Sequence, residues 1–300
     1  MKNIILIVIL NSIAFFGFTQ DNNPVSWKFS SEKIAPLTYK VKFEARVEAP
    51  FHIYPQQASG GGLGMPTEFL FTSNGDIEFV GMVEEKGFEK TDGEEVAYYK
   101  GGATFIQTIH LKSEQKTNLS GTIKYMACND QMCLPPSKVE FTLAINSQDE
   151  PVASGNSSNE EKSSVTYSDF VMADTLGKSV SSKEVISGSK YTLIDFWASW
   201  CVPCRTQGRQ LVPLYDTYKS KGFSVIAISL DTKAEAWKKA IEADKYTRTN
   251  LCDLKGFDSE ISKRYGIVAI PRNFLLDSRG TIIAKDLHGR ELESKLKELF

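Results

Sequence analysis

Two closely spaced pairs of cysteines are the residues in this chain whose type and spacing predict chemistry. Cys201 and Cys204 are separated by two residues, and Cys128 and Cys133 by four. Cysteines this close together can form a disulfide and exchange it with another protein. A zinc site and an inert structural disulfide are the alternatives for Cys201 and Cys204. Zinc needs four ligands, and the three histidines of the chain have no ligand spacing to this pair. An acid in the preceding strand, aromatic residues on both sides of Ala198-Ser199 and a proline between the sulfurs argue against an inert disulfide. We therefore expect reversible disulfide chemistry without a metal or a cofactor, and we expect the fifth cysteine, Cys252, to be a small buried apolar residue.

The sequence around Cys201 places this pair between a strand and a helix. The apolar run Leu193–Trp197 predicts a buried strand that contains one acidic residue, Asp195. Apolar residues then recur at helical spacing, which predicts a helix over Arg205–Lys221. The first sulfur would lie beside the free N–H groups at the helix start, where a thiolate is favoured. The second, Cys204, would lie one turn away, close enough to attack a mixed disulfide and release a substrate.

The segment Asp-Phe-Trp-Ala-Ser-Trp-Cys-Val-Pro-Cys, which ends at Cys204, resembles the active-site segment of thioredoxin-fold proteins, most of all their TlpA/ResA-like branch. The resemblance covers about residues 165–300 and implies an α/β thioredoxin fold. It implies that Cys201 is the nucleophile, that Cys204 resolves the mixed disulfide, and that Asp195 handles the proton of the resolving cysteine. An apolar setting would raise the pKa of Asp195 towards the working pH. A strand-end capping acid is the alternative for this residue.

Pro271 resembles the cis-proline of the same family. A cis bond would hold the loop so that the backbone of Ile270 pairs with an extended substrate strand. An ordinary trans proline in a turn is the alternative. Trp200 would form part of an apolar collar around the sulfurs. A peroxidase is disfavoured, because the pattern Pro-x-x-x-Thr-x-x-Cys is missing around Cys201.

Residues 37–147 predict β-strands almost throughout. Apolar and charged residues alternate from Tyr39 to Val47, which is the period of a strand with one buried face. Further strands are expected at Glu68–Thr72, Ile77–Met82, Val96–Lys100, Ala103–Lys112, Leu119–Met126 and Val139–Ile145. Turn residues separate these strands and no helical pattern interrupts them, which predicts an antiparallel β-sandwich.

The second cysteine pair lies within this sandwich. The residues around Cys128 and Cys133 resemble the N-terminal domain of the DsbD electron-transfer proteins, an immunoglobulin-like sandwich that carries one exchangeable cysteine pair. The segment Phe51–Tyr54, ahead of a glycine-rich loop, also fits that family. The alternative is a structural disulfide that staples the loop. His52 and Tyr54 are expected at an exposed loop edge.

The chain divides into four parts by composition. Residues 1–20 combine Lys2 with an apolar stretch, which is typical of a secretory signal, with an uncleaved membrane anchor as the alternative. Residues 23–146 form the expected β-sandwich domain, and 165–300 the thioredoxin-like domain. Between them, 147–164 contain almost nothing to bury and predict a flexible linker that spans about 25 Å, enough for the two cysteine pairs to meet. We therefore expect a periplasmic or other extracytoplasmic protein that is soluble after signal cleavage.

These parts together predict an exported thiol–disulfide oxidoreductase. No histidine lies between Cys201 and Cys204 to stabilise a thiolate, which favours a reductase over a strong oxidant. We expect electrons to pass between this pair and Cys128/Cys133 and on to oxidised exported proteins, apocytochromes c among them. Resemblance to the two families implies that a membrane electron transporter of the DsbD or CcdA type supplies the electrons. The net charge of −2 does not predict binding to nucleic acid. The alternative is a single-site enzyme whose sandwich is a non-redox docking or substrate-binding module.

Overall fold

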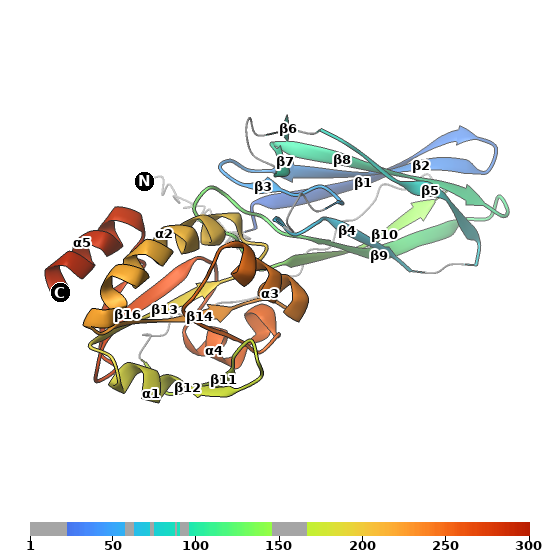
Figure 1. Cartoon of the computed structure of the whole chain (residues 1–300). Coiled ribbons are helices and arrows are strands. Elements are labelled where there is room, and N and C mark those ends of the chain that lie inside the picture. The colour runs from blue at the N-terminus through green and yellow to red at the C-terminus, as the bar shows by residue number, and fades with distance from the viewer. Residues whose placement is uncertain (1–22, 58–62, 73–74, 88, 91–95, 146–166) are drawn as a thin grey trace, which may run out of the picture.

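The structure, a computed structural model, describes residues 23–57, 63–72, 75–87, 89–90, 96–145 and 167–300. A β-rich N-terminal part and an α/β C-terminal part lie side by side and meet where helix α2 (Val202–Tyr218) begins (Figure 1). The signal segment expected at 1–20 and the linker expected at 147–164 lie outside the described residues. Within the described ranges, none of the helices has the length and apolar character needed to cross a membrane.

The N-terminal part is built from antiparallel sheets. One sheet has the strand order β1-β2-β8-β5, and another has the order β10-β9-β4. The strands of the first are Val25–Ala35, Thr38–Val47, Gly102–Leu111 and Ile77–Lys86, and those of the second are Ser137–Ile145, Thr117–Tyr125 and Glu68–Phe71. Every second residue of β2 is buried, as the alternation predicts, and the inward side chains of both sheets share one apolar core.

The strands predicted for this part are confirmed with shifted ends, and the structure adds others. Strand β1 was missed because only Val25 and Phe29 of its residues are buried, so its sequence shows little alternation. A small third sheet has the order β3-β7-β6, with strands His52–Ile53, Ala97–Lys100 and Glu89–Lys90. A mostly β, antiparallel N-terminal part is therefore confirmed, whereas the immunoglobulin-like topology stays a prediction.

The C-terminal part contains a five-stranded sheet in the order β15-β14-β13-β16-β17. Its strands are Thr249–Cys252, Phe223–Ser229, Tyr191–Trp197, Arg272–Asp277 and Ile282–Lys285. The first three run parallel, so they need crossovers, which α2 and α3 (Ala234–Ala243) provide. The other strands and α-helices of this part are the hairpin β11 (Val171–Ala173) and β12 (Ser179–Ser181), and the helices α1 (Ser182–Ser187), α4 (Glu260–Arg264) and α5 (Gly289–Leu299). The predicted α/β fold is confirmed.

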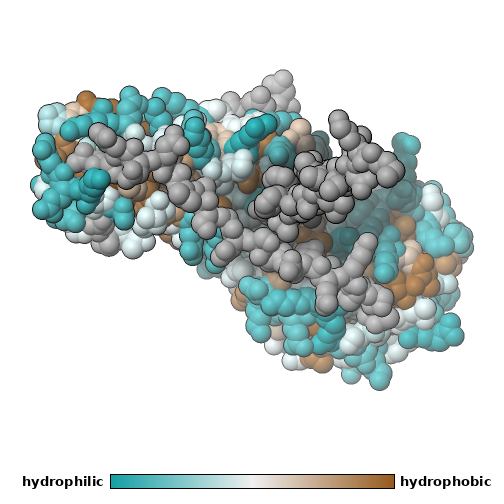
Figure 2. Space-filling model, turned by 180° about the vertical axis from the view of Figure 1, so that it is seen from behind, coloured by the Kyte–Doolittle hydropathy of each residue, from teal (hydrophilic) through white to brown (hydrophobic). Residues whose placement is uncertain are grey.

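Among the residues that the structure describes, the buried apolar side chains form three clusters. One lies inside the N-terminal sheets, one lies between α2, α5 and the C-terminal sheet, and the third spans both parts. Figure 2, which views the chain from behind, shows mostly hydrophilic residues on the visible surface of both parts. The cluster that spans both parts contains all four paired cysteines, so the predicted chemistry lies where the two parts touch.

Candidate active site

Cys201 and Cys204 lie at the start of α2. Cys201 is the N-cap residue, with an extended backbone, and its sulfur accepts a hydrogen bond of 3.2 Å from the N–H of Cys204. Pro203 in the first turn suits a helix start, because the N–H that proline lacks has no partner there in any case. The helix therefore begins at Val202, earlier than the sequence predicted. The two cysteines form a disulfide and are buried, with exposures of 0% for Cys201 and 3% for Cys204.

Asp195 is a buried acid beside a buried cation. Burial raises the pKa of its carboxyl, and the guanidinium of Arg248, whose Nη2 lies 3.7 Å from Oδ2, opposes that rise. The guanidinium is enclosed in turn: it lies 3.8 Å from the ring centroid of Tyr246, and its Nη1 donates to the carbonyl of Gly208 at 3.5 Å. Asp195 pairs with residues on both neighbouring strands of the sheet, so it is not a strand-end cap.

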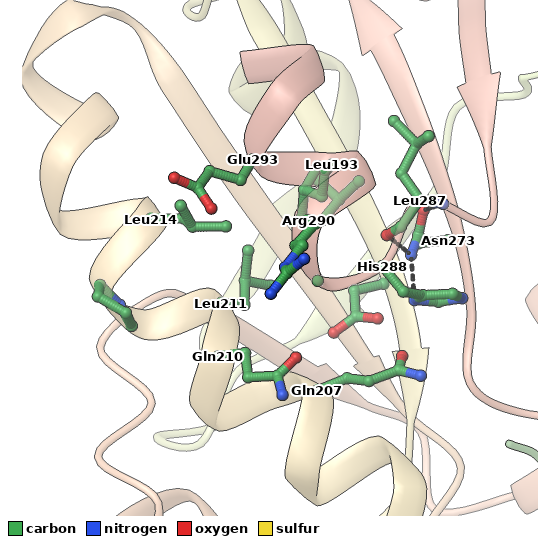
Figure 3. A pocket seen from close by; sticks show the side chains of 14 residues that line it. Leu193, Gln207, Gln210, Leu211, Leu214, Asn273, Leu287, His288, Arg290 and Glu293 are labelled. Atoms are coloured by element: carbon green, nitrogen blue, oxygen red, sulfur yellow. Dashed lines mark hydrogen bonds between the residues drawn. The ribbon is translucent and has the colours of Figure 1, made fainter. Parts of the chain in front are cut away.

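A cavity of about 530 Å³ reaches the same carboxyl group. Figure 3 shows Gln207 of α2 and His288 among the side chains that line it. Burial lowers the pKa of His288, so its imidazole is neutral at neutral pH. Residues three and four apart share a face of a helix, so the side of α2 that carries Gln207 also carries Cys204. Asp195 and the face of α2 that carries the second sulfur therefore border the same cavity, which fits a carboxylate that handles the proton of Cys204.

Asp231 fixes the turn between β13 and α2. Its carboxylate accepts hydrogen bonds from the N–H of Ser199 at 2.9 Å and from the hydroxyls of Ser199 and Ser229 at 2.6 Å each. From the other side, the guanidinium of Arg205 donates to the carbonyl of Ser199 at 3.0 Å and forms a buried ion pair with Asp244. These residues were not predicted from the sequence, because single charged residues in separate segments carry no spacing signal.

The loop at Pro271 holds an extended segment of the same chain. The peptide bond between Ile270 and Pro271 is cis, as predicted. The N–H of Cys133 donates to the carbonyl of Ile270 at 2.7 Å, and the N–H of Ile270 donates to the carbonyl of Cys133 at 3.1 Å. The Sγ of Cys201 lies 4.0 Å from that same Ile270 oxygen. Cys133 therefore lies next to Cys201, where the sequence analysis expected a substrate strand.

A row of antiparallel bridges crosses the contact between the two parts. His52 pairs with Cys128, Cys128 with Cys133, and Cys133 with Ile270. Directly opposed residues in antiparallel segments project their side chains to the same face. The cysteines and Ile270 accordingly belong to the apolar cluster that spans both parts, whereas Ile53, the next residue after His52, faces the N-terminal core. The N-terminal disulfide thus faces the C-terminal part.

The N-terminal part covers the sulfurs. Cys128 and Cys133 form a disulfide with 0% exposure of either residue, and Tyr54 packs in the same cluster. The N–H of Gly64 donates to the carbonyl of Trp200 at 2.9 Å, and the Trp200 side chain packs against the cluster, where a collar was predicted. The backbone of Gly64 passes the ring of Tyr54 so closely, at a φ of +78°, that only glycine fits there without a rearrangement.

One expectation about the N-terminal site is wrong. His52 and Tyr54 are not at an exposed loop edge: they are 6% and 2% exposed. Tyr54 belongs to the apolar cluster that spans both parts, and the ring of His52 stacks on Tyr98 of the same cluster. The burial predicted for Cys252 is confirmed, at 5% exposure. Across the described ranges, no cluster of three or more His, Cys, Asp or Glu residues is placed to hold a metal ion.

Comparisons with known proteins agree with this chemistry. A family model, the AhpC/TSA family, matches residues 165–285. The thiol-disulfide oxidoreductase ResA of Bacillus thuringiensis is 31% identical to this chain, over 43% of this chain and 71% of ResA. The sporulation thiol-disulfide oxidoreductase A of Bacillus subtilis is 30% identical, over 46% of this chain and 82% of that protein. A solved thiol-disulfide oxidoreductase from Bacteroides fragilis is 39% identical, covers 45% of this chain and 99% of its own, and has a TM-score of 0.42. With its thioredoxin-like C-terminal part and its Cys201–Cys204 disulfide, the chain belongs to the ResA-type thiol–disulfide oxidoreductases.

Proposed function

We propose that this oxidoreductase is an extracytoplasmic protein-disulfide reductase in which electrons pass between Cys201/Cys204 and Cys128/Cys133. In this proposal the N-terminal part is a redox domain of the DsbD type, with an immunoglobulin-like sandwich. The observation that carries the proposal is the backbone pairing of Cys133 with Ile270, which brings one disulfide to the other.

The pairing selects the two sulfurs that react first. The carbonyl oxygen of Ile270 accepts from the N–H of Cys133 and lies 4.0 Å from the Sγ of Cys201. Cys128 is one bridge further away, next to His52. The mixed disulfide therefore joins Cys201 to Cys133, and Cys128 is the leaving sulfur.

The exchange balances within the chain. The thiolate of Cys201 attacks the Sγ of Cys133, the Cys128–Cys133 bond breaks, and Cys128 leaves with the electron pair and takes up a proton. Cys204 then gives its proton to the carboxylate of Asp195 and attacks Cys201, which restores the Cys201–Cys204 disulfide and releases Cys133 as a thiolate. Cys133 takes up a proton from water, and Asp195 returns its proton to water. Since the Cys201 thiolate also formed by losing its proton to water, two electrons and, by way of water, two protons have moved from one pair to the other, and the reverse sequence moves them back.

The proposal needs a source and a destination for the electrons. A separate membrane transporter of the DsbD or CcdA type supplies them, and oxidised exported proteins, including apocytochromes c, receive them. Both assignments derive from the family resemblances of the two cysteine segments.

A trapping experiment tests the pairing. In the double variant Cys128→Ala/Cys204→Ala, mild oxidation should join Cys133 to Cys201 within one chain, because the backbone pairing of Cys133 with Ile270 holds Cys133 beside Cys201. Peptide mapping by mass spectrometry identifies the link. The matched control is Cys133→Ala/Cys204→Ala, which leaves Cys128 and Cys201 and should give little internal link. Equal yields in both variants would show that the linker alone brings the sulfurs together, and no link in the first variant would contradict the relay.

A redox titration separates the relay from the single-site alternative. The oxidised chain is equilibrated in glutathione and dithiothreitol buffers, and alkylation with mass spectrometry reports each cysteine pair separately. Two pairs that titrate reversibly support the relay. A Cys128–Cys133 disulfide that stays oxidised while Cys201–Cys204 titrates would make the N-terminal part a docking module with a structural disulfide.

A further inference from the structure

His52 is a buried imidazole beside the N-terminal disulfide. It is 6% exposed, and its backbone exchanges both hydrogen bonds with that of Cys128, at 2.8 and 3.0 Å. Opposed residues in such a pair carry their Cβ atoms about 4.5–5.5 Å apart on one face. The ring stacks on Tyr98, with 4.3 Å between centroids, and Tyr98 belongs to the same apolar cluster as Cys128. The imidazole and the sulfur of Cys128 therefore share one enclosed space.

One nitrogen of this ring lacks a partner. Nε2 of His52 lies 3.3 Å from the hydroxyl of Tyr54, whereas Nδ1 is buried with no hydrogen-bond partner among the described residues. Buried polar atoms are nearly always paired, so this nitrogen needs an explanation. A disulfide has no S–H to donate and is a weak acceptor, but a reduced Cys128 is a thiol or a thiolate. Reduction of the disulfide creates the partner that the ring lacks in the oxidised state.

We propose that His52 is the proton-transfer group of the Cys128–Cys133 pair, a role that rests on the relay proposed above. When Cys128 attacks the mixed disulfide, its thiol proton passes to the neutral imidazole, the new Cys128–Cys133 bond forms, and the other sulfur leaves as a thiolate. The imidazolium then returns its proton to water. When the disulfide is reduced, the steps reverse: the ring takes a proton from water and gives it to the Cys128 sulfur as that sulfur leaves.

The charges around the ring suit this cycle. Burial lowers the pKa of His52 to about 4 in the disulfide state; the charge of Asp130 opposes that shift and the charge of Lys100 adds to it. The pKa of Tyr54 is raised by burial, so its hydroxyl stays neutral beside Nε2. The imidazole is therefore neutral at neutral pH and able to accept a proton. A thiolate at Cys128 adds a negative charge beside the ring and raises the pKa of the imidazole, so the imidazole can hold the proton that the Cys128 thiol gives up.

The test isolates the N-terminal pair in the whole chain. In the Cys201→Ala/Cys204→Ala background, the reduced Cys128/Cys133 pair is oxidised with glutathione disulfide, and disulfide formation is followed by alkylation and mass spectrometry across a pH series. His52→Gln keeps a polar side chain of similar size but cannot titrate. We expect it to slow closure of the disulfide at neutral pH by about 100-fold, within the range of general acid–base catalysis. The difference in rate between His52→Gln and the parent should disappear at about pH 10, where thiols ionise without a base.

The matched control is His110→Gln, in the same part of the chain but on strand β8, where the ring contacts Thr38. It should keep the rate of the parent at every pH. Equal rates for the His52 and His110 variants at neutral pH would overturn the assignment while leaving the relay in place. A slow His52 variant whose deficit persists at high pH would also overturn it, since that deficit would be structural. A parent pair that does not react at all would instead overturn the relay, and the assignment with it.

Discussion

The replacement Gly64→Ala tests whether the close approach of the N-terminal loop to the active-site turn holds the two parts together. Gly64 has a φ of +78°, and a Cβ on it would lie 2.5 Å from Cε1 and 2.9 Å from Cγ of Tyr54. The Tyr54 ring is 2% exposed, so it has no solvent to swing into. The loop must therefore move, and the hydrogen bond of 2.9 Å from the Gly64 N–H to the carbonyl of Trp200 is lost.

The loss of stability expected for Gly64→Ala has three contributions. An L-residue in the left-handed region costs about 1–2 kcal/mol. Packing an extra carbon against a buried ring costs about 1–3 kcal/mol, and a lost hydrogen bond about 1 kcal/mol. We expect the free energy of unfolding to fall by roughly 3–6 kcal/mol in total. The lost hydrogen bond should lower the equilibrium constant for docking of the two parts by roughly fivefold.

The assay has two readouts and a matched control. Urea unfolding measures stability, and the rate of the Cys133–Cys201 link in the Cys128→Ala/Cys204→Ala background measures docking. Gly101→Ala is the control: its φ is +75°, but nothing lies within 4 Å of an added Cβ. It should lose only the conformational contribution and leave the rate of linking unchanged. Equal losses of stability and equal linking rates in the two variants would refute the reasoning, because the ring contact would then contribute nothing.

Three further predictions concern charged and titratable residues. Arg248→Met removes the positive charge that lowers the pKa of Asp195, so that pKa should rise and the acidic limb of the pH–rate profile for disulfide reduction should move to higher pH. Arg248→Lys keeps a positive charge and should move the limb less. A limb that does not move in Arg248→Met contradicts this role. Asp231→Ala removes the carboxylate that holds Ser199 and should lower the free energy of unfolding in urea by about 3 kcal/mol; a loss under about 1 kcal/mol would be too small for charge-assisted bonds. Because the pKa of His52 falls from 6.5 to about 4 on folding, the unfolded chain binds the extra proton between these values, and stability should fall as the pH falls through that window. The slope is at most about 1.4 kcal/mol per pH unit, and His52→Gln should remove it in urea titrations, so a slope that survives the substitution argues against this origin.

The sequence predicted what local patterns determine. The alternation in β2, the strand–turn–helix around Cys201 and the cis-proline at Pro271 are properties of short segments, and each is present. The helix start was placed too late, because Val202 and Pro203 were assigned to the loop between the sulfurs although proline favours the first turn.

The sequence did not predict residues whose roles depend on tertiary contacts. Arg248 belongs to no spaced motif, and a charged side chain ahead of a four-residue strand is normally exposed. Its burial depends on α2, where Gly208 leaves room for the guanidinium and for Tyr246, whose hydroxyl donates to a backbone carbonyl of that helix. His52 was expected to be exposed for the same reason: its ring stacks on Tyr98 and its backbone pairs with Cys128, and these contacts join residues that are far apart in the sequence.

The docked arrangement also limits when a client can bind. On the edge of the loop that meets Cys133, Ile270 presents one N–H and one carbonyl, and Cys133 uses both. An extended substrate strand needs the same two groups, so it cannot pair there while the N-terminal part is docked. Cys201 is also 0% exposed in this state. In the proposed relay, internal exchange and exchange with a partner protein must therefore alternate, and the contact between Gly64 and Trp200 must open once in each cycle.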